Sequence, residues 1–315
     1  MILVCGEALI DMFVAAKADG GLVAEPVAGG SPYNVAIGVA RLGSRSAYFG
    51  GLSTDAFGNL LAGNLAREGV DLSFAPRSNH PTTLVIVSTD AAGVPTYRFI
   101  GEGAADRMLT LADLPAALPE HIKAITFGSL AMGVEPTGST YLALAAREKG
   151  RRVISVDPNL RASVVGDIAA WKVRLEKFIT TANIVKSSIE DVEGTYGHAA
   201  TADAVAAGWL ASGPSLVIVT RGADGATAYW GGGSASIAGR KVPVIDTVGA
   251  GDTFHAALLN YFERKGQLTP AGLKSLTEAT IKDAIAFAAA AAAVTCTRRG
   301  ADMPSLADVE AMLRS

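Results

Sequence analysis

The segment DTVGAGDTFHAA, residues 246–257, joins a glycine-rich turn directly to a helical pattern and carries one carboxylate, Asp252, at the junction. Glycines allow main-chain N–H groups to converge on an anion, and the dipole of the following helix adds partial positive charge at the same point. A carboxylate there can accept a proton. The turn therefore predicts an anion site beside a base, the combination that phosphoryl transfer to a hydroxyl requires.

Two other phosphate-binding motifs fit the sequence of this turn less well. A dinucleotide fingerprint needs a third glycine where Phe254 stands, and the chain has no Gly-Lys dipeptide for a Walker loop. An ordinary helix start, with Asp252 as a first-turn acid, remains the alternative. We expect Asp252 to be ionised near neutrality, because a helix N-terminus favours a charged carboxylate. His255, one turn further on, either contacts phosphate or is packed in the interior, and we favour packing.

Composition indicates a well-buried globular chain that acts on a small metabolite. Half of the 315 residues are hydrophobic, 18% are charged, and the net charge is −3. Nothing in this balance favours nucleic acid or a membrane surface as a partner. The two cysteines, Cys5 and Cys296, have no zinc-site spacing, and the apolar N-terminus has no basic leader. We expect one domain over residues 1–315 in a cytoplasmic protein, with the uncharged run Ala284–Thr297 as an internal helix.

Short apolar runs alternate with helical patterns along most of the chain. This alternation predicts a parallel sheet with helices on both faces, in which ligands gather beyond the carboxyl ends of the strands. The expected strands are Ile2–Gly6, Ala47–Gly51, Ala124–Gly128, Val153–Asp157, Ile184–Ser187 and Leu216–Thr220.

One region breaks the alternation. Leu84–Thr89 and Val94–Ile100 flank the turn at residues 90–93 and predict two strands joined as a hairpin. With residues around 12–27 they could form a small sheet that projects from the main one. Pattern alone leaves a lid and an ordinary edge hairpin equally open.

Two distant motifs together resemble one family. DTVGAGDTF at residues 246–254 resembles the C-terminal signature of the ribokinase-like (PfkB) carbohydrate kinases, and GGSPYNVA at residues 29–36 is similar to their N-terminal Gly-Gly-x-x-x-Asn motif. The resemblance implies a Rossmann-like three-layer α/β/α fold with a mostly parallel central sheet and a small β lid, built from about residues 12–30 and 82–104. It also implies ATP-dependent phosphorylation of a sugar hydroxyl, with dimerisation through the lid.

The resemblance assigns roles to individual residues. It implies that Asp252 is the base and that Gly249, Ala250 and Gly251 form the anion hole. The substrate contacts that it implies, together with those added from neighbouring motifs, are Asp11, Gly29, Gly30, Asn34, Arg98, Asn159 and Arg161. Three of them also have a purely structural interpretation: Asp11 as a turn acid, Gly30 as a turn glycine and Asn34 as a helix cap.

The nucleotide contacts follow from VTRGADG at residues 219–225, which is similar to a family turn along the ribose and phosphates. They are Thr220, Gly222 and Gly225, with Gly251 of the anion hole. Glu190 matches the acid of the family's Asn-x-x-Glu motif, which is associated with Mg²⁺ through water, whereas Ser187 departs from the asparagine. Lys186 could reach phosphate. The resemblance further implies a monovalent cation, K⁺ in particular, on main-chain oxygens of Asp246, Val248 and the segment near 289–300.

The motifs indicate more than one possible sugar substrate. DPNLR at residues 157–161 resembles fructokinases and 2-keto-3-deoxygluconate kinases alike, and Arg161 could pair with phosphate or with an acidic substrate. Residues 97–99, 103–107 and 248–259 look more like fructokinases, so fructose, phosphorylated at a primary hydroxyl to fructose 6-phosphate, is ranked first. The keto-deoxy acid is second, with Arg98 as its second cation. A non-catalytic sensor on the same fold is the competing class, and a redox enzyme is more distant.

Overall fold

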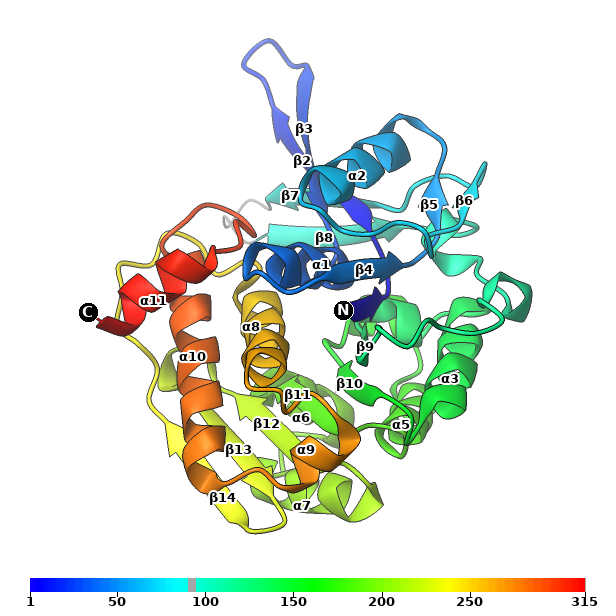
Figure 1. Cartoon of the computed structure of the whole chain (residues 1–315). Helices are drawn as coiled ribbons and strands as arrows, with labels where there is room; N and C mark the ends of the chain where they lie inside the picture. The colour runs from blue at the N-terminus through cyan, green and yellow to red at the C-terminus, as the bar shows by residue number, and fades with distance from the viewer. Residues whose placement is uncertain (90–94, 315) are drawn as a thin grey trace.

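The computed structural model describes residues 1–89 and 95–314, and its main sheet contains eight strands in the order β14-β13-β12-β11-β10-β9-β1-β4 (Figure 1). Their bounds are β1 (Ile2–Cys5), β4 (Ser46–Phe49), β9 (Ala124–Gly128), β10 (Val153–Asp157), β11 (Ile184–Ser188), β12 (Leu216–Thr220), β13 (Ala226–Trp230) and β14 (Gly233–Ile237). The strands from β4 to β12 are parallel, and they are the six expected from the apolar runs, within one or two residues at their ends. Strands β13 and β14 add an antiparallel edge that the alternation did not predict.

Helices cover both faces of the main sheet, because successive residues of its buried strands point to opposite sides. One face packs against α1 (Ser31–Arg41), α2 (Ala56–Arg67), α8 (Ala250–Arg264), α9 (Pro270–Lys274), α10 (Glu278–Cys296) and α11 (Leu306–Arg314). The other packs against α3 (Thr137–Glu148), α5 (Ile168–Ile179), α6 (Ile189–Tyr196) and α7 (Ala202–Ser212). The remaining elements are α4 (Ala162–Val165), the paired strands β5 (Leu52–Ser53) and β6 (Arg77–Ser78), and the 3₁₀ turns η1 (Ala105–Arg107), η2 (Leu111–Asp113), η3 (Leu130–Met132) and η4 (Gly222–Asp224). The fold is the expected three-layer α/β/α arrangement.

Helix α10 is, among the described residues, the one helix long and apolar enough to cross a bilayer by length and composition. Core helices of water-soluble proteins have the same composition, so this is weak evidence for a membrane span. The alanine-rich side of α10 packs against α8, and Ala284, Ala288 and Ala291 are fully buried there. Small side chains allow that close approach, which fits the internal helix expected from the sequence.

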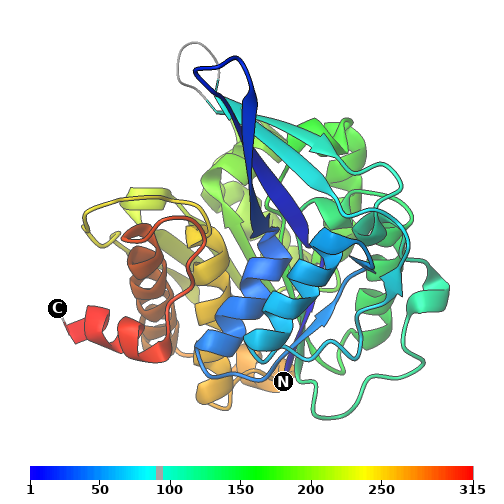
Figure 2. The same ribbon diagram turned by 90° about the horizontal axis from the view of Figure 1, so that it is seen from above.

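A second sheet projects from the edge of the main one, and Figure 2 shows its long hairpin rising above the helices. Its order is β3-β2-β7-β8, with bounds β2 (Leu9–Ala16), β3 (Leu22–Gly29), β7 (Leu84–Thr89) and β8 (Pro95–Ile100). Strands β7 and β8 pair antiparallel, as the hairpin pattern predicted, while the turn expected at residues 90–93 lies outside the described residues. This small sheet is the lid of the fold.

Candidate active site

The glycine-rich turn leads into α8 with a geometry that only glycine accepts at its first position. Gly249 is the N-cap residue and has a left-handed backbone, with φ at 78°. A Cβ atom added there would lie 2.6 Å from Cβ of Ala301, so the turn packs directly on the chain after α10. The N–H groups of the first turn of a helix lack intrahelical acceptors. Those of Ala250, Gly251 and Asp252 can therefore bind an anion at this point, as the sequence predicted.

The carboxylate of Asp252 lies under this turn and is held by two residues from the start of α1. Ser31 Oγ donates to Asp252 Oδ1 over 2.6 Å, and Asn34 Nδ2 donates to Asp252 Oδ2 over 2.8 Å. Helix α1 can begin there because Gly30 has φ at 107° and passes within contact of the main chain at Glu7. The structure thus brings the two distant motifs together. Sequence reasoning quoted Ser31 within its motif but assigned it no role.

The environment of Asp252 shifts the pKa of its carboxyl. The side chain is only 8% exposed, and burial raises its pKa above the ordinary value for aspartate. The hydrogen bonds from Ser31 and Asn34 and the charge of Lys186 oppose that rise without cancelling it. Burial therefore has a larger effect on this carboxyl than the groups that favour its charged form, and its ionisation near neutrality stays a prediction. A raised pKa makes the carboxylate a stronger acceptor of a hydroxyl proton.

A group of buried polar side chains lies beneath the turn. Lys186 Nζ is 2.8 Å from Asp157 Oδ2, and His255 Nδ1 is 3.5 Å from the same oxygen. His255 is 1% exposed, which agrees with the packed position we favoured over a phosphate contact. Lys186 is 4% exposed and is paired with Asp157 inside the protein, so it is not a solvated surface lysine. Sequence reasoning gave Asp157 no individual role.

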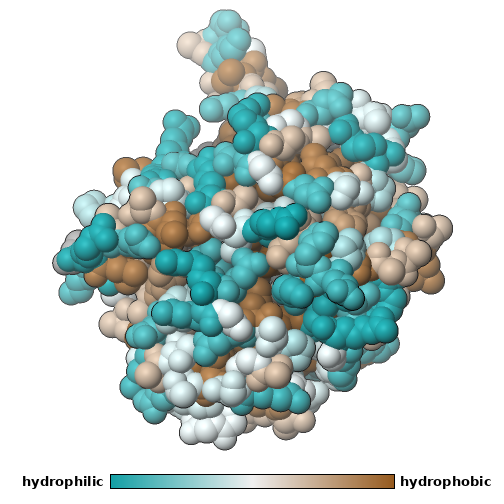
Figure 3. Space-filling model, in the orientation of Figure 1, coloured by the Kyte–Doolittle hydropathy of each residue, from teal (hydrophilic) through white to brown (hydrophobic). Residues whose placement is uncertain are grey.

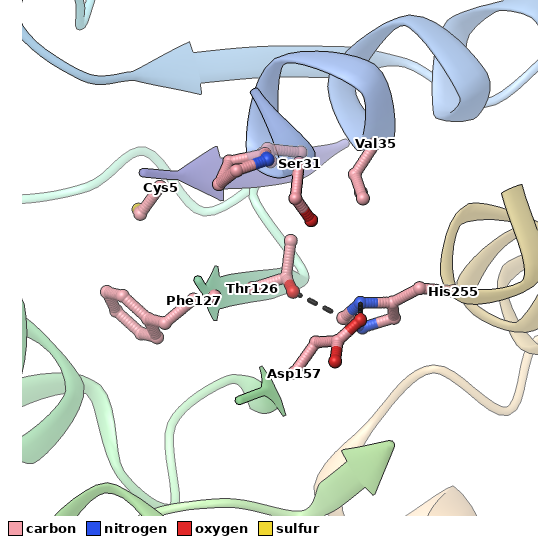
Figure 4. A pocket seen from close by; sticks show the side chains of 10 residues that line it. Cys5, Ser31, Val35, Thr126, Phe127, Asp157 and His255 are labelled. Atoms are coloured by element: carbon pink, nitrogen blue, oxygen red, sulfur yellow. Dashed lines mark hydrogen bonds and ion pairs between the residues drawn. The ribbon is translucent and has the colours of Figure 1, made fainter. Parts of the chain in front are cut away.

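A small cavity adjoins this group and is lined by Ser31, Thr126, Asp157 and His255 among others (Figure 4). Its volume of about 10 Å³ suits at most a single water molecule. It is therefore too small to hold a sugar.

The lid brings a second carboxylate over the entry to α1. A Cβ atom at Gly29 would lie 2.5 Å from Asp11 Oδ2, so the absence of a side chain at Gly29 makes room for this carboxylate. Burial raises the pKa of Asp11 to about 6, and the positive charge of Arg161 acts in the opposite direction. Asp11, Gly29 and Arg161 are thus close to one another, as the substrate assignments require.

Arg98 does not lie beside Asp11, Gly29 and Arg161 of the same chain. The strand pairing aligns Asp11 with Val85 and Val85 with Phe99, so these three residues share one face of the lid. Arg98 is the neighbour of Phe99 and lies on the opposite face, where it is exposed. Its assignment as a substrate contact stays a prediction that this geometry does not favour.

The loop after β10 carries the other two substrate candidates. Asn159 has a left-handed backbone, with φ at 37°, and Arg161 is exposed at the start of α4. The loop is tied to α6, since the N–H of Leu160 donates to Asp191 Oδ1 over 2.8 Å. Asp191 also accepts the N–H of Ser188 and caps α6. Sequence reasoning missed Asp191, although Ser188-x-x-Asp191 is a recognisable capping box.

The nucleotide-side candidates lie at the ends of β11 and β12. Thr220 is the last residue of β12, Gly222 opens η4 with φ at 52°, and a Cβ at Gly225 would lie 2.0 Å from the carbonyl of Ile237. Glu190 is exposed at the start of α6, whereas its neighbour Asp191 is buried and interacts with Lys186 and Asp157. An exposed, single carboxylate suits a Mg²⁺ contact through water rather than a closed metal cage. The described residues contain no group of three or more metal-ligating acidic, histidine or cysteine side chains.

The residues proposed for a monovalent cation are also brought together. Asp246 Oδ1 accepts the N–H of Val248 over 3.0 Å, and Oδ2 accepts the N–H of Gly300 over 2.8 Å. Partial burial acts to raise the pKa of Asp246, but these N–H groups hold it below the ordinary value. The ionised side chain thus fastens the segment before the anion-hole turn to the chain after α10. The two segments that carry the proposed main-chain ligands thus lie side by side, with the N–H of Asp246 3.4 Å from the carbonyl oxygen of Cys296.

The fold and this arrangement define a sugar-phosphorylating enzyme of a known class. A family model described as "pfkB family carbohydrate kinase" matches residues 1–308. The chain belongs to this family and is a carbohydrate kinase, which confirms the resemblance read from the two motifs.

Several proteins similar to this chain are fructokinases. A fructokinase of Rhizobium leguminosarum bv. trifolii is 39% identical over 283 residues, which are 90% of this chain and 86% of that protein. The crystal structure of a fructokinase from Xylella fastidiosa with bound ATP has a TM-score of 0.91 at 28% identity and covers 99% of this chain and 98% of its own. A Vibrio cholerae O395 fructokinase double mutant was solved with fructose, ADP and potassium ion. It has a TM-score of 0.83 at 28% identity and covers 99% of this chain and 97% of its own.

Proposed function

We propose that this protein is an ATP-dependent fructokinase that phosphorylates the primary hydroxyl at C6 of fructose. The observation that carries the proposal is the pair of hydrogen bonds from Ser31 and Asn34 to Asp252, which fixes a buried carboxylate at the N-terminus of α8. Such a carboxylate is a general base next to an anion site. The fructokinase relative at 39% identity favours fructose among the possible sugars.

In the proposed reaction Asp252 accepts the hydroxyl proton while the sugar oxygen attacks the γ-phosphorus in line. The new O–P bond forms as the bond between the γ-phosphorus and its bridging oxygen breaks, so ADP leaves with the electron pair. Ser31 and Asn34 keep both oxygens of the carboxylate oriented. The amides of Ala250, Gly251 and Asp252 stabilise the negative charge that develops on the transferred group. Closure of the lid, with Asp11 on its inner face, would exclude water as a competing acceptor.

The residues present fit ATP, Mg²⁺ and a monovalent cation. Thr220, Gly222 and Gly225 would hold the nucleotide, and nothing lies within 4 Å of the Cβ position of Gly222, so ribose and phosphates could approach the main chain closely there. Glu190 would bind Mg²⁺ through water, and the metal would supply charge neutralisation of the phosphates. The main-chain oxygens of Asp246 and Val248 would bind the monovalent cation, and the potassium ion in the Vibrio cholerae structure supports K⁺ as its identity.

A second substrate, 2-keto-3-deoxygluconate, is favoured by one observation. Arg161 lies close enough to Asp11 to lower the pKa of that carboxyl, so a guanidinium faces the substrate side of the lid. Such a group could pair with a substrate carboxylate. A non-catalytic sensor is less well supported, because a sensor needs the pocket but not the buried base.

The experiment that tests these alternatives is an ADP-release assay over fructose, ribose, 2-keto-3-deoxygluconate, tagatose and adenosine, with and without potassium. Fructose should give the highest kcat/KM, and potassium should raise it. A keto-deoxy acid that is turned over while fructose is not would replace the substrate and leave the kinase class intact. Sugar binding without ADP release would support the sensor.

We also propose a homodimer formed through the lid as the working assembly, and the cytoplasm as its compartment. Figure 3 shows hydrophobic side chains on the projecting sheet below its polar tip. The exposed large apolar residues of this sheet are Phe13, Leu22, Val23, Val27, Tyr97 and Ile100. A second lid would cover this surface. Light scattering should give twice the monomer mass, and replacing Leu22 and Val23 by lysine should give the monomer; a monomeric parent would exclude the dimer.

A further inference from the structure

Lys186 belongs to a group of buried polar residues, in which Asp157 is its direct partner. Asp157 lies at the end of β10, Ser155 lies two residues earlier on the same strand, and His255 lies in the second turn of α8. Together with Lys186 of β11 they form the buried polar cluster, and every member is at most 4% exposed. Figure 4 shows the imidazole of His255 between Thr126 and Asp157. A buried cluster of this kind is stable only when its charges and hydrogen bonds are matched.

The lysine of this cluster lies directly against the anion-hole turn. A Cβ atom added to Gly251 would be 3.2 Å from Lys186 Nζ, so the ammonium packs on the main chain between Ala250 and Asp252. The positive charge of Lys186 lowers the pKa of Asp252, and it does so more strongly than the negative charge of Asp157 raises it. The positive end of the Lys186–Asp157 pair therefore faces the turn. There it adds to the amides that stabilise negative charge.

The position of the ammonium depends on the carboxylate of Asp157. Burial acts to lower the pKa of Lys186, but the charge of Asp157 holds it above the ordinary value. Burial likewise acts to raise the pKa of Asp157, and Lys186 followed by His255 holds it below. Both groups are thus charged and keep each other in place. Asp191, on α6, is a second carboxylate that attracts the same lysine and would draw it away from the turn.

His255 fixes the orientation of that carboxylate. Its Nε2 atom is 2.8 Å from Ser155 Oγ and 3.3 Å from Thr126 Oγ1, two hydroxyls that can donate to it. Its Nδ1 atom is 3.5 Å from Asp157 Oδ2, the oxygen that also binds Lys186. A hydrogen on Nδ1 is required, since a bare nitrogen would present its lone pair to the carboxylate.

We propose that His255 is a positioning residue for phosphoryl transfer, which acts through Asp157 to hold the ammonium of Lys186 beneath Gly251. The proposal rests on the kinase function proposed above but not on the identity of the sugar. His255 touches neither sugar nor nucleotide. Its contribution is to kcat, because the charge that Lys186 helps to stabilise develops only as the phosphoryl group moves.

Two substitutions separate this role from simple packing. Asparagine can place an amide N–H where Nδ1 stands, whereas glutamine can bond Ser155 at the position of Nε2 without a donor toward Asp157. We expect His255→Gln to lower kcat about 10- to 100-fold, the usual loss on removing an outer partner of an active-site group, with the KM for sugar nearly unchanged. His255→Asn should keep kcat within about threefold of the parent, because its amide N–H still faces Asp157. Both variants remove the ring, so their Tm values should fall together. Equal kcat values in the two variants would reduce His255 to a packing residue.

A spectroscopic measurement on the parent protein tests the proposal without activity. In a long-range ¹H–¹⁵N spectrum of the imidazole rings, the signals lost in His255→Asn identify His255 among the four histidines. We expect a hydrogen on Nδ1 throughout the pH range in which the enzyme works. A bare Nδ1 there would overturn the proposal even if the protein proves to be a fructokinase. An Nδ1–H in a protein that phosphorylates no sugar would instead remove the proposed function.

Discussion

Asn34 Nδ2 and Asp252 Oδ2 are joined by a 2.8 Å hydrogen bond across 218 residues of sequence. Asn34 lies in the first turn of α1, which begins where lid strand β3 ends, and Asp252 lies in the first turn of α8. The two helices also pack against each other along their length. Helix α1, which follows directly after lid strand β3, therefore also orients the proposed base.

Replacing Asp252 by asparagine should lower kcat by at least about 100-fold, because an amide cannot accept the hydroxyl proton. The side chain keeps its size, so the Tm should stay close to that of the parent. Turnover by ADP release and thermal unfolding on the same preparation check this. Turnover within about threefold of the parent, far less than the usual loss, would show that Asp252 is not the base.

Ser31→Ala should move the acid limb of the kcat profile to higher pH. The hydrogen bond from Ser31 lowers the pKa of Asp252, so its loss raises that pKa and a larger fraction of the base is protonated at a given pH. Activity at the upper plateau should fall much less than in Asp252→Asn. Superimposable profiles for variant and parent, each measured from pH 5 to 9, would contradict the electrostatic role of this bond.

Glu7→Gln should make the fold less sensitive to pH. Glu7 is 1% exposed, and burial raises its pKa from 4.5 to about 7, with a further rise from nearby Asp106. Between those values the unfolded chain releases the proton while the folded protein keeps it, so the parent loses stability as the pH rises, by about 3 kcal/mol at most. Glutamine has no such loss and should be more stable than the parent at pH 8.

Urea unfolding at pH 5, 6.5 and 8 measures this difference. The gain in free energy of unfolding of Glu7→Gln over the parent should grow with pH and level off above about 7. Asp106→Asn is the matched control, because burial raises the pKa of Asp106 to about 6, and its gain should level off earlier. A constant difference at all three pH values would mean that Glu7 titrates in the folded protein as it does in the unfolded chain.

Gly251→Ala should impair turnover more than stability. The added methyl group would lie 3.2 Å from Lys186 Nζ and must displace the ammonium, whereas the helical backbone of this residue accepts alanine without strain. Gly63→Ala in α2 is the control, since nothing lies within 4 Å of its Cβ position and alanine favours a helix by about 1 kcal/mol. Unchanged kcat in Gly251→Ala would place Lys186 outside the machinery of the turn.

The sequence predicted the parallel strands well because each is a short apolar run buried on both faces. Strands β13 and β14 escaped notice since Ala226–Trp230 and Gly233–Ile237 are rich in small residues, and only their pairing with β12 makes them strands. Asp252 and Asn34 were found through motifs. The roles of Ser31 and Asp157 were not predicted, because their partners Asp252 and Lys186 come from other elements, whereas the capping box Ser188-x-x-Asp191 is visible in the sequence. Arg98 could have been placed better, since strand alternation already separates it from Phe99 and Asp11.

Helices α1 and α8 carry the proposed base and its two hydrogen-bond partners on one packed unit, while Asp11 belongs to the separate small sheet. If Asp11 binds the sugar as proposed, the small sheet shares substrate choice with Asn34, which also holds the proposed base. Substitutions on the inner face of the small sheet should then change which hydroxyl compound is admitted while Ser31, Asn34 and Asp252 stay in place. A fold divided in this way would acquire new substrates through its lid and keep the helix pair that positions the base.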